Sequence, residues 1–350
     1  MIDLVLLAVA FTVILVGAEL FTNGVEWAGH RLDLSEGAVG SILAAVGTAL
    51  PETAVPAVAI LLGGGAAASD EIGVGAILGA PFMLATLALG VVGLTVLSQR
   101  ANRSSGDRVD AQREPIQRDV TVFAVAYTLA IGAAFVPVDI GWVRPAVAIG
   151  LVVIYALYVR AHLMEERAEG GHPNPLRLHR LDRAHHRLDP HLPRSRIIAL
   201  QVAVGLAGIV GGAIIFVQAV QDGARILGIA PLILALVISP IATELPEAAN
   251  GFLWVRRQKD TLALGNITVA MVFQACVPTV LGLLLVPRAW AFTFETAVPF
   301  TSVALAFASL LVIFWPLLQG RVLTGRRLLT GGGFYAVFLV LVALDLAGLI

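Results

Sequence analysis

The sequence predicts an all-α, polytopic membrane protein with ten transmembrane helices arranged as two inverted five-helix repeats. Hydrophobic residues make up 58% of the 350 residues and charged residues only 13%, whereas soluble domains carry about 25% charged residues. The chain also contains ten apolar runs, each close to the roughly 20 residues that span a bilayer. Finally, a short string that ends in Pro-Glu occurs twice, 195 residues apart.

The ten predicted spans follow one another with short polar loops between most of them. The first span begins Met1-Ile2-Asp3, without a positively charged start or a small-residue cleavage pattern, so it is predicted to be a retained helix rather than a signal peptide. In chain order the spans are residues 2–24, 37–62, 71–97, 120–137, 141–160, 197–220, 229–255, 261–286, 296–318 and 328–349.

The basic residues predict the orientation of these spans. With the N-terminus outside, 20 of the 23 lysines and arginines fall in inner loops, as the positive-inside rule requires. We therefore expect a multi-pass protein of the cell inner (plasma) membrane with both termini outside. Residues 1–161 would form the first repeat, 162–196 a basic, His-rich cytoplasmic linker, and 197–350 the second repeat.

Internal similarity supports the two repeats. A shift of 195 residues, without a gap, pairs Thr48 with Thr243, Pro51 with Pro246 and Glu52 with Glu247. Each half holds five spans, an odd number, so the two halves must run through the membrane in opposite directions. Inverted repeats are the architecture of many secondary transporters, which hold substrate near the midplane between broken helices.

The two repeated strings, Gly47–Glu52 and Ala242–Glu247, place a proline and a carboxylate inside apolar spans. A carboxylate at membrane depth is costly and is a functional-site candidate by default. The neighbouring proline frees a backbone carbonyl from the helix ladder. Carboxylate and carbonyl oxygens together are the ligands that a hard cation requires, so the strings predict a cation site built from both halves.

At these residues the chain resembles the cation/calcium exchanger superfamily, with a membrane domain of the sodium/calcium exchanger type. The family's Gly-Thr-Ser-x-Pro-Glu pattern is present from Gly47 to Glu52, with Ala49 at the serine position, and Glu244 takes that position in the second string. The resemblance implies calcium ligands at Glu52 and Glu247. It also implies backbone or hydroxyl ligands at Thr48 and Thr243.

The chain departs from the family on the third and eighth helices. Alanine stands at residues 80 and 270, where sodium-coupled members have serines that help to form sodium sites, and the stretch that begins at Gln274 is closer to proton-coupled calcium exchangers. Alanine, proline and leucine also replace polar ligands at residues 76, 81 and 84, whereas Asn266 and Gln274 remain as oxygen donors. The predicted metal ligands are Glu52, Glu247, Thr48, Thr243, Glu244, Gln274 and Asn266.

Electrostatics also predicts that transport is coupled to protons. Glu244 and Glu247 are three residues apart and share a helix face, while Glu52 approaches from the other repeat. Three neighbouring carboxylates repel one another and cannot all be ionised without a cation, so a divalent ion would displace a proton. We expect a secondary active antiporter that exports calcium, or a related divalent cation, in exchange for protons or sodium by alternating access.

The alternative is an ion channel or a transport-inactive cation sensor on the exchanger fold. An enzyme is not expected, because the spans offer no catalytic serine–histidine or paired-aspartate arrangement and no phosphate-binding loop. No tightly bound cofactor is expected beyond the transported calcium ion and its counter-ion, and the expected partners are inorganic cations and the lipid bilayer, without nucleic acid.

Each site residue also has a purely structural interpretation. Glu52 and Glu247 could bond helix ends, Glu244 could face the inner vestibule as a solvated residue, and the threonines could bond carbonyls of their own helices. Gln274 could bridge helices, and Glu19 could have a gating or packing role rather than line the ion path. For the linker, attraction to anionic lipid headgroups is favoured over a metal or pH sensor. Its histidines are His162, His172, His179, His185, His186 and His191.

Overall fold

The computed structural model describes residues 2–31, 38–165, 175–182 and 193–349. Within these ranges the description includes the side chains, except at residues 2, 3, 38–49, 163–165, 180, 182, 242 and 295. The regular secondary structure of the described residues is helical, apart from an isolated β-bridge between Arg108 and Thr324.

The first half contains five long helical segments. Helix α1 spans Ile2–Arg31, and α2 spans Ala38–Leu62 without a break across Pro51 and Pro56. Helix α3 (Ala67–Met83), a π-helical turn η1 (Leu84–Ala88) and α4 (Leu89–Gln99) form one continuous rod. Helix α5 (Arg113–Gly132) ends in the 3₁₀ turn η2 (Ala133–Phe135), and α6 spans Val143–Glu165.

The second half starts after the short 3₁₀ segment η3 (Arg177–Asp182). Helix α8 spans Ser195–Leu227, and α9 (Pro231–Thr243) is separated from α10 (Leu245–Arg256) by Glu244 alone. Helix α11 spans Asp260–Leu285. The turn η4 (Phe294–Thr296) leads into α12 (Ala297–Leu318), and α13 spans Gly325–Leu346.

These helices lie at the ten predicted positions. Among the described residues, nine helical segments are long and apolar enough to cross a membrane, and α2 takes the remaining predicted position, with its Leu50–Leu62 part counted as a shorter apolar helix. The predicted start of the linker at residue 162 differs from the structure, because α6 continues through His162 to Glu165. His162 is therefore a residue of a transmembrane helix.

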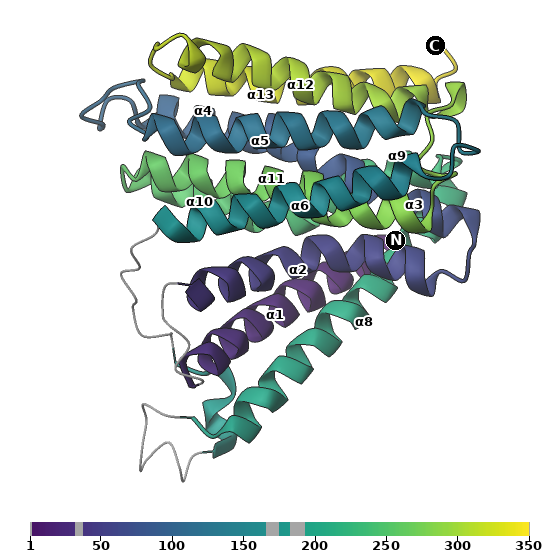
Figure 1. Ribbon diagram of the computed structural model, residues 1–350, viewed down its shortest axis with the longest axis horizontal. Helices are drawn as coiled ribbons and strands as arrows, with labels where there is room; N and C mark the ends of the chain where they lie inside the picture. The colour runs from purple at the N-terminus through teal and green to yellow at the C-terminus, as the bar shows by residue number, and fades with distance from the viewer. Residues whose placement is uncertain (1, 32–37, 166–174, 183–192, 350) are drawn as a thin grey trace.

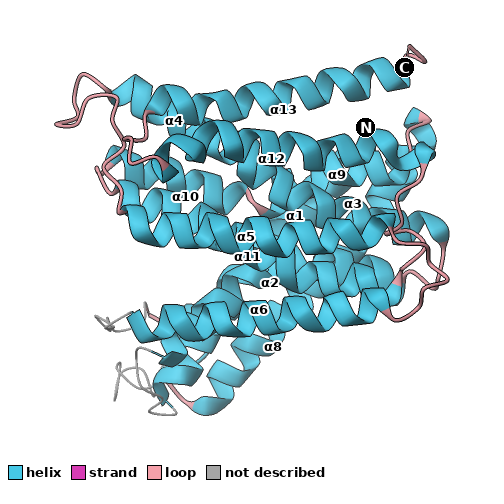
Figure 2. Cartoon of the chain, turned by 45° about the horizontal axis from the view of Figure 1, so that its top comes forward, coloured by secondary structure: helices cyan, strands magenta, loops and turns pink. Residues whose placement is uncertain are grey.

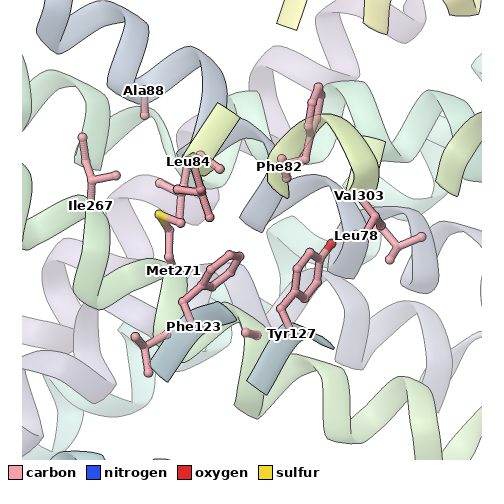
Figure 3. Close-up of a cluster of buried hydrophobic side chains, with 14 of the residues drawn as sticks. Leu78, Phe82, Leu84, Ala88, Phe123, Tyr127, Ile267, Met271 and Val303 are labelled. Atoms are coloured by element: carbon pink, nitrogen blue, oxygen red, sulfur yellow. The ribbon is translucent and has the colours of Figure 1, made fainter. Parts of the chain in front are cut away.

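The helices pack as two bodies. Helices α1 and α8 lie together over most of their length and, with α2, occupy one side of the molecule, as Figure 1 shows. The hydrophobic cluster between them includes Ile14, Ile209 and Phe216, and it extends to Ile72 of α3 and Ala235 of α9. The remaining helices share a second, larger core, in which Phe82 of α3, Tyr127 of α5 and Met271 of α11 lie close together (Figure 3).

Glycines allow two pairs of helices to approach closely. A side chain at Gly17 of α1 would meet the backbone of α8 at Ile209. On α3, side chains at Gly75 and Gly79 would meet the carbonyl oxygens of Leu232 and Leu236 in α9. The close crossing of α3 and α9 holds the first repeat against the helix that ends within the second Pro-Glu string.

One end of the bundle gathers the basic loops, and we call it the basic end. Here Arg103 forms a buried ion pair with Asp260, and the amide of Val109 donates to the carbonyl of Leu323, which joins three loops. The linker meets the same end, because Arg31 of α1 donates to the carbonyl of Pro193. Both chain termini lie toward the opposite end (Figures 1 and 2).

Candidate functional site

Three buried glutamates meet in the middle of the bundle. Glu52 belongs to α2, Glu244 stands between α9 and α10, and Glu247 lies in the first turn of α10. One carboxylate oxygen of each residue lies within 4.8 Å of the other two. The structure thus brings the matched pair from the two strings together and adds the third acid of the second string.

The break at Glu244 explains how this residue reaches the site. Its backbone, with φ −95° and ψ 0°, ends α9 and begins α10. Its amide donates to the carbonyl of Pro240, and its carbonyl accepts from Ala248, so the backbone stays bonded across the break. Pro246 fits the first turn of α10 because the amides there have no helical partner. The positive end of α10 also favours the carboxylate of Glu247.

The site holds oxygen atoms that lack hydrogen-bond donors. The second carboxylate oxygen of Glu52, of Glu244 and of Glu247 is buried without a partner, and so is the amide oxygen of Gln274. A buried polar atom without a partner costs about 1–3 kcal/mol, and more when charged. Four such oxygens in one place are suited to a bound cation or to protons.

The two predicted amide ligands differ in their contacts. Gln274 is buried in α11, and its Nε2 donates to Oε1 of Glu244 at 2.9 Å. It therefore bridges two helices, and its free oxygen stays near the carboxylates. Asn266 is half-buried, and its Nδ2 approaches the backbone carbonyl of Glu247 at 3.4 Å.

The two predicted hydroxyl ligands, Thr243 and Thr48, have weaker support from the contacts of the structure than the glutamates have. The hydroxyl of Thr243 has the carbonyl of Ser239 at 3.2 Å and Oε1 of Glu244 at 3.4 Å, and its one proton serves one of them at a time. The contact with Ser239 fits the interpretation in which Thr243 only bonds a carbonyl of its own helix. Thr48 lies on the helical backbone of α2, but its side chain is outside the described part of the structure.

A cavity of about 500 Å³ leads from the glutamates to the basic end. Glu52, Glu247 and Gln274 line its deep end, and Gln112, which directly precedes α5, and Thr261 of α11 lie near its mouth. Glu244 does not line the cavity and is fully buried, at 0% exposure. The interpretation of Glu244 as a solvated vestibule residue is therefore not what the structure shows.

The cavity also contains residues that the sequence reasoning missed. Asp119, nearly two turns into α5, is buried on the cavity wall and accepts hydrogen bonds from Tyr158 of α6 and Thr268 of α11. The fourth span is predicted to start at residue 120, so Asp119 falls just outside it. An aspartate that directly precedes an apolar run was the available signal. Glu19, in contrast, is exposed and pairs with Arg177 of η3, away from the cavity-lining residues.

Chemically, the site offers hard oxygen ligands and an excess of negative charge. Carboxylate and amide oxygens suit Ca²⁺ and similar cations rather than soft metals. Because three carboxylates lie so close together, the site without a cation must hold protons on some of them. A divalent cation and protons would thus compete for the same atoms.

Comparison with known proteins identifies relatives of this fold. The family model described as sodium/calcium exchanger protein matches residues 2–164 and again residues 197–346. A crystal structure of the H⁺/Ca²⁺ exchanger CAX superposes with a TM-score of 0.70 at 17% identity, covering 99% of this chain and 86% of that one.

Two further solved structures have the same fold. Native YfkE gives a TM-score of 0.63 at 14% identity, covering 96% of this chain and 91% of that one. The sodium-calcium exchanger NCX_Mj gives 0.52 at 16% identity, covering 97% and 98%. No curated protein matches the sequence. Identities this low establish the shared fold only.

Proposed function

Because the chain belongs to the sodium/calcium exchanger family, we propose that it is a secondary active antiporter that exports calcium, or a related divalent cation, in exchange for protons. The observation that carries the proposal is the cluster of Glu52, Glu244 and Glu247 at the deep end of the cavity. Two of its three acids line a water-sized path to the basic end of the bundle.

Protons are favoured over sodium as the counter-ion by two features of the site. The third carboxylate, Glu244, lies where the family pattern has serine, and it adds an acid that must be protonated or cation-bound. Ala80 is buried on α3 and Ala270 lines the cavity, and neither side chain offers an oxygen to sodium. Each calcium ion that enters would displace protons from the carboxylates, and its departure would let protons return.

The orientation and the route follow from the charge distribution. We place the basic end in the cytoplasm of the cell inner (plasma) membrane and both termini outside. Residues 1–161 and 197–350 act as the two repeats. The described cavity then corresponds to a state open to the cytoplasm. Helices α1 and α8 pack mainly on each other, so we propose that this pair shifts against the larger core to expose the carboxylates to the other side.

The test is calcium-45 flux in proteoliposomes, with a pH gradient and a sodium gradient imposed separately on the wild type and on Glu247→Gln. A pH gradient should drive calcium uptake in the wild type, and a sodium gradient should not. Glu247→Gln keeps the shape of the side chain but removes its charge, so its flux should be lost.

Each other outcome identifies a different function. Flux driven by sodium alone would replace the proton with sodium as counter-ion. Passive calcium conductance without counter-flow would indicate a channel, and calcium binding without flux would indicate a sensor. Unchanged flux in Glu247→Gln would refute the assignment of the site.

A further inference from the structure

Helix α8 has different neighbours at its two ends. Near the basic end, Gln201 is fully buried, and its Nε2 donates to the carbonyl of Leu20 and to Oδ1 of Asn23, both on α1, at 2.9 Å each. At the opposite end, which we call the outer end, a side chain at Gly223 would lie 3.5 Å from Leu234 of α9. Figure 1 shows α8 diverging from the larger core toward the basic end. Helix α8 is therefore joined to α1 near the basic end and meets the larger core at the outer end.

A hydrogen bond connects α8 to α3 at the outer end. Nε2 of Gln221 donates to Oγ of Ser69 at 2.8 Å, between residues 152 positions apart in the sequence. Ser69 is 1% exposed and lies in the first turn of α3. The turn between α2 and α3 packs directly against it, because a side chain at Gly63 would meet Cβ of Ser69 at 2.3 Å. We call the bond between Gln221 and Ser69 the outer latch.

Apolar side chains close the interface beside the outer latch. Val220 of α8, Ile72 of α3 and Ala235 of α9 are all 0% exposed and belong to one hydrophobic cluster. The cavity, in contrast, leads from the glutamates toward the basic end. The outer latch therefore lies where α8 stays packed on α3 and α9 while the carboxylates face the other side.

The strength of the outer latch suits a contact that breaks and forms again. A hydrogen bond between neutral side chains changes an equilibrium about fivefold. The buried ion pair of Arg103 and Asp260 at the basic end is different, because its separation would leave an uncompensated buried charge. When α8 separates from α3, water can enter the interface and replace the bond at Gln221 and Ser69. The two residues can thus part and meet again in every transport cycle.

We propose that Gln221 and Ser69 are positioning residues that hold the outer end closed, and that their bond breaks when the pair of α1 and α8 shifts. The proposal rests on the proposed function for this shift. Without the outer latch the closed arrangement is less stable, so the population that is open at the outer end rises about fivefold. Neither residue lines the cavity, so this effect does not depend on a bound cation.

The test measures how often the outer end opens, in detergent solution without calcium. The reporter is Val220→Cys in a Cys276→Ala background, because the side chain at residue 220 is completely buried while the outer end is closed. A charged methanethiosulfonate reagent reaches the new thiol only when the interface separates. The modification rate is compared among this parent, Gln221→Leu, Ser69→Ala and the double variant. Size-exclusion elution verifies the fold of each protein.

Each single variant should raise the modification rate about fivefold. The double variant should raise it no further than either single variant, because both substitutions remove the same bond. The matched control is Gln218→Leu, the same substitution at an exposed position about one turn earlier in α8, and it should leave the rate unchanged.

Cys276 provides a second control in chains that keep Val220. It is buried in the larger core, so its modification reports unfolding rather than opening of the outer end. Its rate should be the same in Gln221→Leu as in the wild type.

Unchanged rates at residue 220 in both single variants would overturn the proposal. Additive increases in the double variant would also overturn it, and so would an equal increase in the rate at Cys276. None of these measurements requires transport. A wild type without calcium flux would therefore count against the proposed function alone.

Discussion

The two Pro-Glu elements are related by sequence but differ in shape. Helix α2 runs through Pro51 without a break, whereas its counterpart is interrupted at Glu244 and forms α9 and α10. The neighbouring helices differ too: α11 holds Gln274 nine residues after Gly265, whereas the first repeat holds Leu84 nine residues after Gly75. A repeated motif therefore does not guarantee a symmetric site.

The two repeats contribute unequal numbers of ligand candidates to the site. Among the described side chains, the first repeat supplies one ligand candidate, Glu52, while Gly75 and Gly79 of its α3 allow α9 to pack closely. The second repeat supplies Glu244, Glu247 and Gln274, and the helix break brings the first of these into the cluster. The excess negative charge that couples protons to a divalent cation thus comes mainly from the second repeat.

The largest loss of calcium flux should come from substitution of Glu52 or Glu247, the glutamates at matching positions of the two repeats. Glu52→Gln and Glu247→Gln should each lower calcium flux about 100-fold or more, because each removes one charged partner of a buried cation. The measurement is calcium-45 uptake driven by a pH gradient. Glu19→Gln is the control, since Glu19 is exposed and pairs with Arg177, and its flux should be unchanged. Unequal losses in the two variants would show that the asymmetry extends to the matched pair.

A smaller effect is expected when the asymmetry at Glu244 is removed. Glu244→Ala gives the second string the alanine that the first string has at residue 49. Calcium binding should weaken about tenfold, or 1.4 kcal/mol, and fewer protons should be released per calcium bound. Calorimetry in buffers of different ionisation enthalpy counts these protons, and Glu244→Gln controls for side-chain volume. An unchanged proton count in both variants would remove Glu244 from the coupling mechanism.

Gln274→Leu makes α11 resemble the first repeat at Leu84 and should have a more modest effect. It removes the 2.9 Å hydrogen bond to Glu244, a contribution of about 1 kcal/mol. Calcium affinity should fall about fivefold, measured by the concentration dependence of flux. Gln274→Glu is the companion variant, because it adds a fourth acid and should steepen the pH dependence. Wild-type affinity in Gln274→Leu would indicate that Gln274 only fills space between helices.

The smallest effect is predicted for Thr243→Val. Its hydroxyl reaches the carbonyl of Ser239 in its own helix, so its loss should change calcium affinity by no more than about twofold. Thr243→Ser keeps the hydroxyl and controls for the methyl group. A tenfold loss in the valine variant alone would show that the hydroxyl is a cation ligand.

Features that depend on local sequence were predicted correctly, and features that depend on distant partners were not. The ten helical positions and the meeting of Glu52 with Glu247 follow from hydrophobic run length and from the repeated string. The extent of α6 was underestimated, because the polar residues after Arg160 suggested a loop, whereas helical hydrogen bonds continue to Glu165. Asp119 was missed because its partners, Tyr158 and Thr268, lie 39 and 149 residues away.

The sequence by itself determined the membrane class, the two repeats and the identity of the carboxylates, because hydrophobicity, residue spacing and charge are local properties. Only the tertiary structure decided that the second Pro-Glu element breaks while the first stays straight, that Glu244 is buried behind the cavity, and that Gln221 of α8 meets Ser69 of α3 at the outer end. Those outcomes depend on which helices pack against one another and on where their polar groups find partners, and sequence spacing within one helix does not specify either.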